Sequence, residues 1–103
     1  MPIYVVTYEH PDDAGWAVHV MPHVAWLQDR VADGSLLASG PYEGTAVKSA
    51  MLLLKAADRP ALDALIASDP FAKEGLIANM TVQAWDPIFG AFNAQSSMPK
   101  AVA

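Results

Sequence analysis

Two short apolar runs without alternation constrain the fold of this chain more than any other feature. Residues 3–6 read IYVV and residues 51–54 read MLLL, so neighbouring side chains are apolar throughout both runs. Successive side chains of a strand point to opposite faces of its sheet, and a strand with one face in water should therefore alternate. Helices can cover only one face of such a sheet. We expect a second copy of the chain to cover the other face.

The rest of the sequence supplies the elements around these two strands. Gly34 is placed to end a first helix, and Asp58 can cap a second helix with Pro60 in its first turn. Pro22 either kinks the first helix or marks its true start. The predicted elements are strand 3–8, helix 14–33, strand 35–40, strand 50–55, a helix after Asp58, a helical turn after Asp69 and strand 77–85. This order predicts an α+β, ferredoxin-like fold with helices on one face of an antiparallel sheet.

Length, charge and composition narrow the class of protein. A chain of 103 residues makes one domain, which we place at residues 1–90, with a tail at 91–103 that we expect to be poorly ordered. A net charge of −5 with scattered basic residues argues against nucleic acid as a partner. The sequence has no cysteine, no signal peptide pattern and no apolar run long enough for a membrane span. We therefore expect a soluble, cytoplasmic protein.

Three histidines can titrate near neutral pH. His10 falls in the predicted turn after the first strand, where a solvated loop residue is expected. His19 and His23 are four residues apart, a spacing used by metal-binding pairs on helices. No third ligand is evident in the sequence, so we expect no metal site.

His23 and Asp69 each allow a chemical and a purely structural interpretation. His23 shares a helical stripe with Val20 and Leu27, so it should point toward the sheet as an acid–base group or as a hydrogen-bonded core histidine. Asp69 precedes Pro70, which is an ordinary N-cap arrangement. Their spacing alone does not predict that the two side chains meet.

Two longer motifs resemble the YCII-related (YciI-like) family. His23 is followed by Leu27, Gly34 and the run LLASGP at residues 36–41, with the family's spacing from histidine to Gly-Pro. The run DPFAKEGL at residues 69–76 is similar to the family's later motif. The resemblance covers residues 2–86 and implies a dimeric α+β barrel, associated through its sheets, with His23 and Asp69 together in a cleft.

One departure from the family pattern bears on the ligand. The family commonly has arginine three residues before the histidine, and this chain has Val20 there, with Pro22 directly before His23. Loss of an arginine removes a fixed anion-binding fork. The change favours an apolar, aromatic or phenolic small molecule over a phosphate- or carboxylate-bearing one.

The resemblance implies an enzyme without a cofactor that moves protons on a small cyclic or aromatic metabolite. The family's best-understood activity is dehydrochlorination of a chlorinated hydroxyquinol, so we expect a lyase or an isomerase of aromatic degradation. His23 would be the acid or base and Asp69 would orient it. The expected pocket walls are Trp26, Ser39, Pro41 and Phe71. A ligand-binding regulatory dimer without turnover and a cofactor-free monooxygenase are the alternatives.

Overall fold

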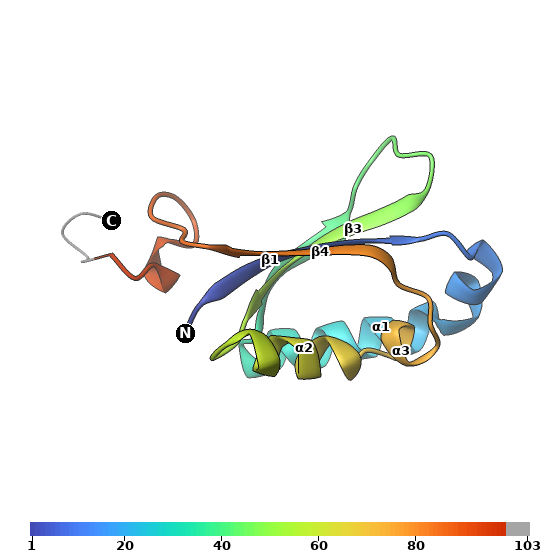
Figure 1. Cartoon of the computed structure of the whole chain (residues 1–103), viewed down its shortest axis with the longest axis horizontal. Coiled ribbons are helices and arrows are strands. Elements are labelled where there is room, and N and C mark those ends of the chain that lie inside the picture. The colour runs from blue at the N-terminus through green and yellow to red at the C-terminus, as the bar shows by residue number, and fades with distance from the viewer. Residues whose placement is uncertain (99–103) are drawn as a thin grey trace.

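A computed structural model describes residues 1–98 as one antiparallel sheet with its helices packed on a single face (Figure 1). The elements are β1 (Ile3–His10), α1 (Asp13–Asp33), β2 (Leu36–Pro41), β3 (Lys48–Lys55), α2 (Arg59–Ala67), α3 (Pro70–Lys73), β4 (Ala78–Trp85) and the 3-10 turn η1 (Asn93–Gln95). The strands lie in the order β2-β3-β1-β4, and every neighbouring pair is antiparallel. The predicted α+β, ferredoxin-like arrangement is therefore confirmed.

The central strands β1 and β3 run further than their sequence patterns predict. Their pairing extends from Ile3 opposite Lys55 to His10 opposite Lys48. The prediction placed His10 in a turn because a Pro-Asp-Asp sequence follows it, whereas the ladder to β3 continues to the end of β1. This extension brings His10 onto the sheet face that the helices cover.

The core fills the space between that face of the sheet and the helices. Tyr4, Val6 and Tyr8 of β1 belong to one buried cluster, and so do Leu52 and Leu54 of β3. From the helices, the same cluster takes Trp26 of α1 together with Leu62 and Ile66 of α2. The alternate residues of β1 and β3 therefore point to the opposite face of the sheet.

Helix α1 is continuous through Pro22. The Asp12 side chain caps it by accepting a hydrogen bond from the Gly15 amide at 3.0 Å, and Gly34 ends it in the left-handed conformation. The interpretation that the helix begins near Pro22 is therefore wrong. Pro22 removes one backbone hydrogen-bond donor from the helix. Burial of His23 and Trp26 on the inner side of the helix offsets that loss, so the helix continues through the proline.

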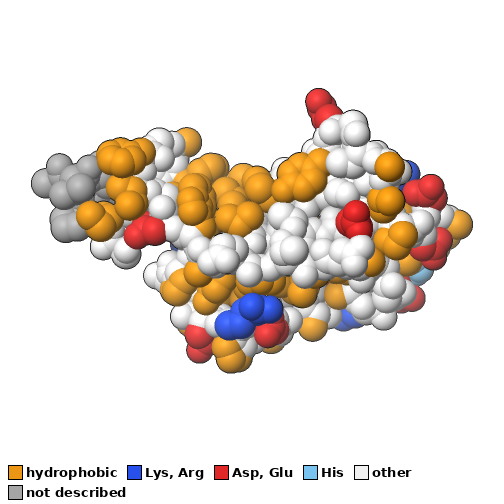
Figure 2. All heavy atoms as spheres, turned by 45° about the horizontal axis from the view of Figure 1, so that its top comes forward, with side chains coloured by type: hydrophobic (Ala, Val, Ile, Leu, Met, Phe, Trp, Pro, Cys, Tyr) orange, Lys and Arg blue, Asp and Glu red, His pale blue; other side chains and the backbone are white. Residues whose placement is uncertain are grey.

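The sheet face turned away from the helices is apolar at its centre. Ile3 and Leu53 on this face are 2% and 6% exposed, and Val5 and Met51 are half-buried. Figure 2 shows hydrophobic side chains gathered across this face, with the C-terminal segment at one end and the β2–β3 loop at the other. Val5, Met51 and Trp85, which is 41% exposed, leave apolar surface on this face, and a second copy covering it stays a prediction.

The segment after β4 folds back on its own start. Asp86 accepts a hydrogen bond from the Ser97 amide at 3.2 Å, and Lys55 donates to Gln95 at 3.3 Å. The boundary at residue 90 stays a prediction, and residues 99–103 of the predicted tail lie outside the described residues. Within residues 1–98, no helix is long and apolar enough to cross a membrane.

Candidate active site

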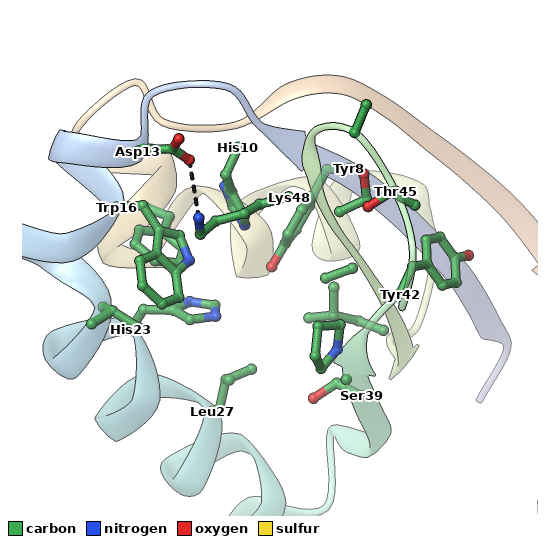
Figure 3. A pocket seen from close by; sticks show the side chains of 18 of the residues that line it. Tyr8, His10, Asp13, Trp16, His23, Leu27, Ser39, Tyr42, Thr45 and Lys48 are labelled. Atoms are coloured by element: carbon green, nitrogen blue, oxygen red, sulfur yellow. Dashed lines mark hydrogen bonds and ion pairs between the residues drawn. The ribbon is translucent and has the colours of Figure 1, made fainter.

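A cavity of about 440 Å³ lies between α1, the helix-facing side of the sheet and the β2–β3 loop. Tyr8 and His10 extend into it from β1, and His23 faces them from α1 (Figure 3). Leu27 and Ser39 line its lower part, and Lys48 lies in its upper part in this view. Residues from the N-terminal half of the chain thus form nearly the whole cavity.

His23 is held by a buried carboxylate that lies behind the cavity wall. Nδ1 of His23 is 2.8 Å from Oδ1 of Asp69, and Asp69 is only 1% exposed. The same Oδ1 accepts a hydrogen bond from the Phe71 amide at 3.0 Å, which caps the short helix α3. One carboxylate oxygen therefore orients the imidazole and starts the helix that carries Phe71.

This geometry determines which nitrogen of His23 is available for chemistry. A carboxylate only accepts hydrogen bonds, so Nδ1 of His23 carries the hydrogen that it donates to Asp69. The lone pair of the neutral imidazole is then on Nε2, on the side of the ring away from Asp69. An arrangement of this kind is suited to accepting a proton from a ligand in the cavity.

Phe71 connects the two histidines of the site. The ring of His23 stacks on Phe71 with centroids 4.1 Å apart and planes 23° from parallel. The ring of His10 lies 4.6 Å from the same phenyl group and 6.5 Å from the ring of His23. A shared aromatic neighbour thus restricts the orientation of both imidazoles.

His10 lines the cavity, which was not predicted from the sequence. It is 4% exposed, so the prediction of a solvated loop residue is wrong. Its Nδ1 lies 2.8 Å from the carbonyl oxygen of Leu76, which can only accept, so Nδ1 carries the hydrogen. The only sequence signal for this role was the parity that His10 shares with Tyr8 and Val6 on β1.

Tyr8 is the second cavity residue that sequence reasoning missed. It is 3% exposed and its ring lies 4.9 Å from the ring of His10. Burial raises the pKa of the Tyr8 hydroxyl far above its ordinary value, and the negative charge of Asp69 raises it further. Tyr8 is therefore a neutral hydrogen-bond donor over the physiological pH range.

The lining of the cavity includes a charged pair. Lys48 Nζ lies 3.1 Å from Asp13 Oδ1 and 5.2 Å from the centre of the Trp16 ring. Both charged side chains are well exposed, so the pair contributes little to stability. Val20 also lines the cavity, and Lys48 is the one lysine or arginine in that lining within residues 1–98.

The expected pocket residues fall into two groups. Ser39, Pro41 and Phe71 line the cavity. Trp26 is not part of its lining, and its indole nitrogen donates a hydrogen bond to the Ser68 hydroxyl at 2.8 Å. Contact of any of these residues with a ligand stays a prediction.

The remaining histidine lies outside this constellation. His19 Nε2 is 3.9 Å from Glu74 Oε2 on the half-exposed side of α1, and His19 does not line the cavity. Over residues 1–98, no group of three or more histidine, cysteine or acidic side chains is placed to hold a metal ion.

The fold and the cavity together define a ferredoxin-like α+β protein with a buried histidine–aspartate pair at the edge of a cavity. Residues 1–86 match the family model of the YCII-related domain, and the chain belongs to the YCII-related family. Among curated proteins, no sequence matches the chain closely enough to count as a relative.

Solved structures that this chain resembles include the following three. The 5-chloro-2-hydroxyhydroquinone dehydrochlorinase TftG of Burkholderia phenoliruptrix, in complex with 2,5-dihydroxybenzoquinone, is 22% identical with a TM-score of 0.62, over 81% of this chain and 93% of that one. Rv0793 of Mycobacterium tuberculosis is 18% identical with a TM-score of 0.54, over 88% and 99%. A dimeric ferredoxin-like protein of unknown function from Jannaschia sp. is 17% identical with a TM-score of 0.47, over 84% and 99%. At these identities, TftG and Rv0793 show a likeness of fold.

Proposed function

We propose that this protein is a small enzyme that moves a proton on a cyclic or aromatic metabolite, with His23 as the acid–base group. The observation that carries the proposal is the 2.8 Å contact between His23 Nδ1 and the buried Asp69 carboxylate. It leaves Nε2 of His23 as the acceptor for a ligand in the cavity, and Asp69 stabilises the imidazolium that forms. The family and the dehydrochlorinase TftG, a structure of similar fold, favour an oxygenated ring as the substrate.

The reaction class follows from what one base can do in such a cavity. Nε2 of His23 accepts a proton from a ring C–H or O–H, and the electron pair of that bond moves into the ring. In an elimination, a leaving group such as chloride departs with its bonding pair. In an isomerisation, His23 returns the proton to another ring atom. Neither route requires a cofactor, so we propose a cofactor-independent lyase or isomerase.

A chloride-release assay with a chlorinated hydroxyquinol tests this function. In His23→Asn, the amide can still donate to Asp69, but the acceptor at Nε2 is gone. We expect the rate of chloride release to fall by about 100-fold or more, the usual contribution of an acid–base group. His19→Ala removes a histidine from the same helix outside the cavity, so its rate should equal that of the wild type.

Oxygen uptake and thermal stabilisation, measured with the same compound, separate the alternatives. A cofactor-free monooxygenase would consume oxygen in proportion to product, whereas elimination releases chloride without oxygen uptake. A binding protein without turnover would be stabilised thermally by the ring compound and would form no product. Unchanged chloride release in folded His23→Asn would refute the role of His23.

We further propose that the active form is a homodimer associated through the apolar sheet face. Val5 and Met51 are partly exposed apolar side chains on that face, and two such faces can cover each other. A cytoplasmic setting stays a prediction from the absence of cysteine.

A further inference from the structure

The Tyr8 hydroxyl opens onto the cavity and makes no hydrogen bond within the described protein. Tyr8 is 3% exposed as a residue and lines the cavity, and among residues 1–98 no hydrogen bond joins its Oη to another group. Its Oη is not among the fully buried side-chain atoms that lack a partner, so this atom is accessible from the cavity. Figure 3 shows the oxygen of Tyr8 directed into the cavity from β1. A ligand in the cavity can therefore reach this hydroxyl and accept a hydrogen bond from it.

The character of this hydroxyl indicates what kind of partner it accepts. Burial, and then the negative charge of Asp69, raises the pKa of Tyr8, so the hydroxyl keeps its hydrogen and acts as a donor. A buried donor favours an acceptor that carries partial or full negative charge. The carbonyl, enolate or phenolate oxygen of a ring meets that requirement.

Tyr8 and His23 stand on opposite walls of the cavity. His23 comes from α1 and Tyr8 from β1, and both side chains point inward (Figure 3). Leu27, Pro41 and Phe71 add apolar side chains to the lining. A flat ring between the two walls would meet a base on one side and a donor on the other.

We propose that the Tyr8 hydroxyl recognises an oxygen of the ring substrate and stabilises the negative charge that this oxygen gains during proton transfer. The inference rests on the proposed function and narrows its substrate class to cyclic carbonyl compounds and phenols. When His23 takes a proton from the ring, the electron pair of the broken bond is delocalised onto the ring oxygen. Tyr8 donates a hydrogen bond to that oxygen and keeps its own proton, as a donor in an oxyanion hole does.

Binding of a series of substituted phenolates tests the proposal without requiring turnover. The probes differ in the basicity of their oxygen and are titrated calorimetrically at a pH where each is ionised. Wild-type affinity should rise with oxygen basicity, because a stronger acceptor makes a stronger hydrogen bond. In Tyr8→Phe, affinity should fall by about tenfold for the most basic probe, and the dependence on basicity should disappear.

Tyr4→Phe is the matched control. Tyr4 lies on the same face of β1 and is buried, but it does not line the cavity, so its affinities should equal those of the wild type. If Tyr8→Phe does not fold, 3-fluorotyrosine placed at position 8 keeps the shape and strengthens the donor, and the dependence on basicity should steepen. An unchanged dependence in either Tyr8 variant, or no binding of any phenolate to the wild type, would overturn the proposal.

The same probes distinguish failure of this inference from failure of the proposed function. His23→Asn should lose chloride release but keep the Tyr8-dependent trend in phenolate affinity. If no ring compound is turned over and the trend is present, proton transfer by His23 is wrong and oxygen recognition by Tyr8 is supported. If turnover depends on His23 and the trend is absent, proton transfer by His23 is supported and oxygen recognition by Tyr8 is wrong.

Discussion

His10 shows how a single residue can hold a cavity wall in place. Its Nδ1 donates to the Leu76 carbonyl in a buried setting, while Phe71 packs against its ring. Losing this donor leaves the Leu76 carbonyl without its partner, and an unpaired buried carbonyl costs about 1–3 kcal/mol. His10 is therefore a positioning residue that stabilises the link between β1 and the segment before β4.

Substitution of His10 tests this interpretation. We expect His10→Ala to lower the free energy of unfolding by about 2 kcal/mol, measured by urea denaturation. His10→Asn retains an amide donor near the position of Nδ1 and should recover about half of that loss. Equal losses in the two variants would mean that packing against Phe71, rather than the hydrogen bond, is what His10 provides.

Sequence reasoning identified part of the site and missed the rest for identifiable reasons. His23 and Asp69 were named from family motifs, but their contact spans 46 positions and depends on how α1 packs against α3. Tyr8 reads as an ordinary core aromatic of a strand. His10 reads as a turn residue because its pairing with Lys48 depends on a distant strand. Long-range packing decides these three features, and local pattern does not reveal it.

At the scale of an element, the first turn of α1 is fitted tightly against the segment before β4. A Cβ at Gly15 would lie 2.6 Å from Cδ2 of Leu76 and 2.6 Å from Oδ2 of Asp12, the capping residue. A glycine here allows α1 to approach Leu76, whose carbonyl binds His10. The close packing of α1 against Leu76 therefore depends on the absence of a side chain at Gly15.

Gly15→Ala sets helix propensity against this close approach. Alanine in a helix gains about 1 kcal/mol over glycine, and overpacking costs about 1–3 kcal/mol. We expect a net loss of about 1 kcal/mol in the free energy of unfolding, measured by thermal or urea denaturation. Gly40→Ala is the control, because no atom lies within 4 Å of a Cβ added there. Stabilisation by Gly15→Ala would mean that Leu76 moves aside without cost.

The order of elements was predictable because it depends on local signals. Asp58 before Arg59-Pro60 and Gly34 after α1 mark helix ends in the structure as the sequence predicts. Strand lengths were underestimated because β1 and β3 extend each other to His10 and Lys48. Continuity at Pro22 was left open by the sequence, since burial on the inner side of α1 decides it.

At the scale of the whole molecule, the two faces of the sheet differ in what covers them. Helices cover the face with Tyr4, Val6 and Tyr8, and the opposite face keeps an apolar centre around Val5 and Leu53. The unbroken hydrophobic runs predicted that both faces of the sheet are apolar. The register explains this pattern, because Val5 pairs with Leu53 on one face and Val6 pairs with Leu52 on the other. A sheet with such a face is suited to pairing with its own copy.

Val5→Lys tests pairing through this face. Val5 is half-buried at the centre of β1, beside Leu53 on β3, so a lysine there would place a charge inside a sheet-to-sheet contact. We expect the wild type to have the mass of a dimer by light scattering and Val5→Lys to have that of a monomer at the same concentration. Ala25→Lys adds the same charge on the exposed side of α1 and should remain a dimer. A monomeric wild type, or a dimeric Val5→Lys, would contradict the proposal.

The double use of one oxygen atom of Asp69 has a consequence for mutational scanning. A library sorted for protein abundance would lose most replacements at position 69, because they leave the Phe71 amide and the start of α3 without an acceptor. A library sorted for turnover would lose the same variants. Scores of mutational tolerance alone would therefore not separate the role of Asp69 in capping α3 from its role in orienting His23. Asparagine, which keeps an acceptor oxygen but lacks the charge, is the replacement at which the two selections should diverge.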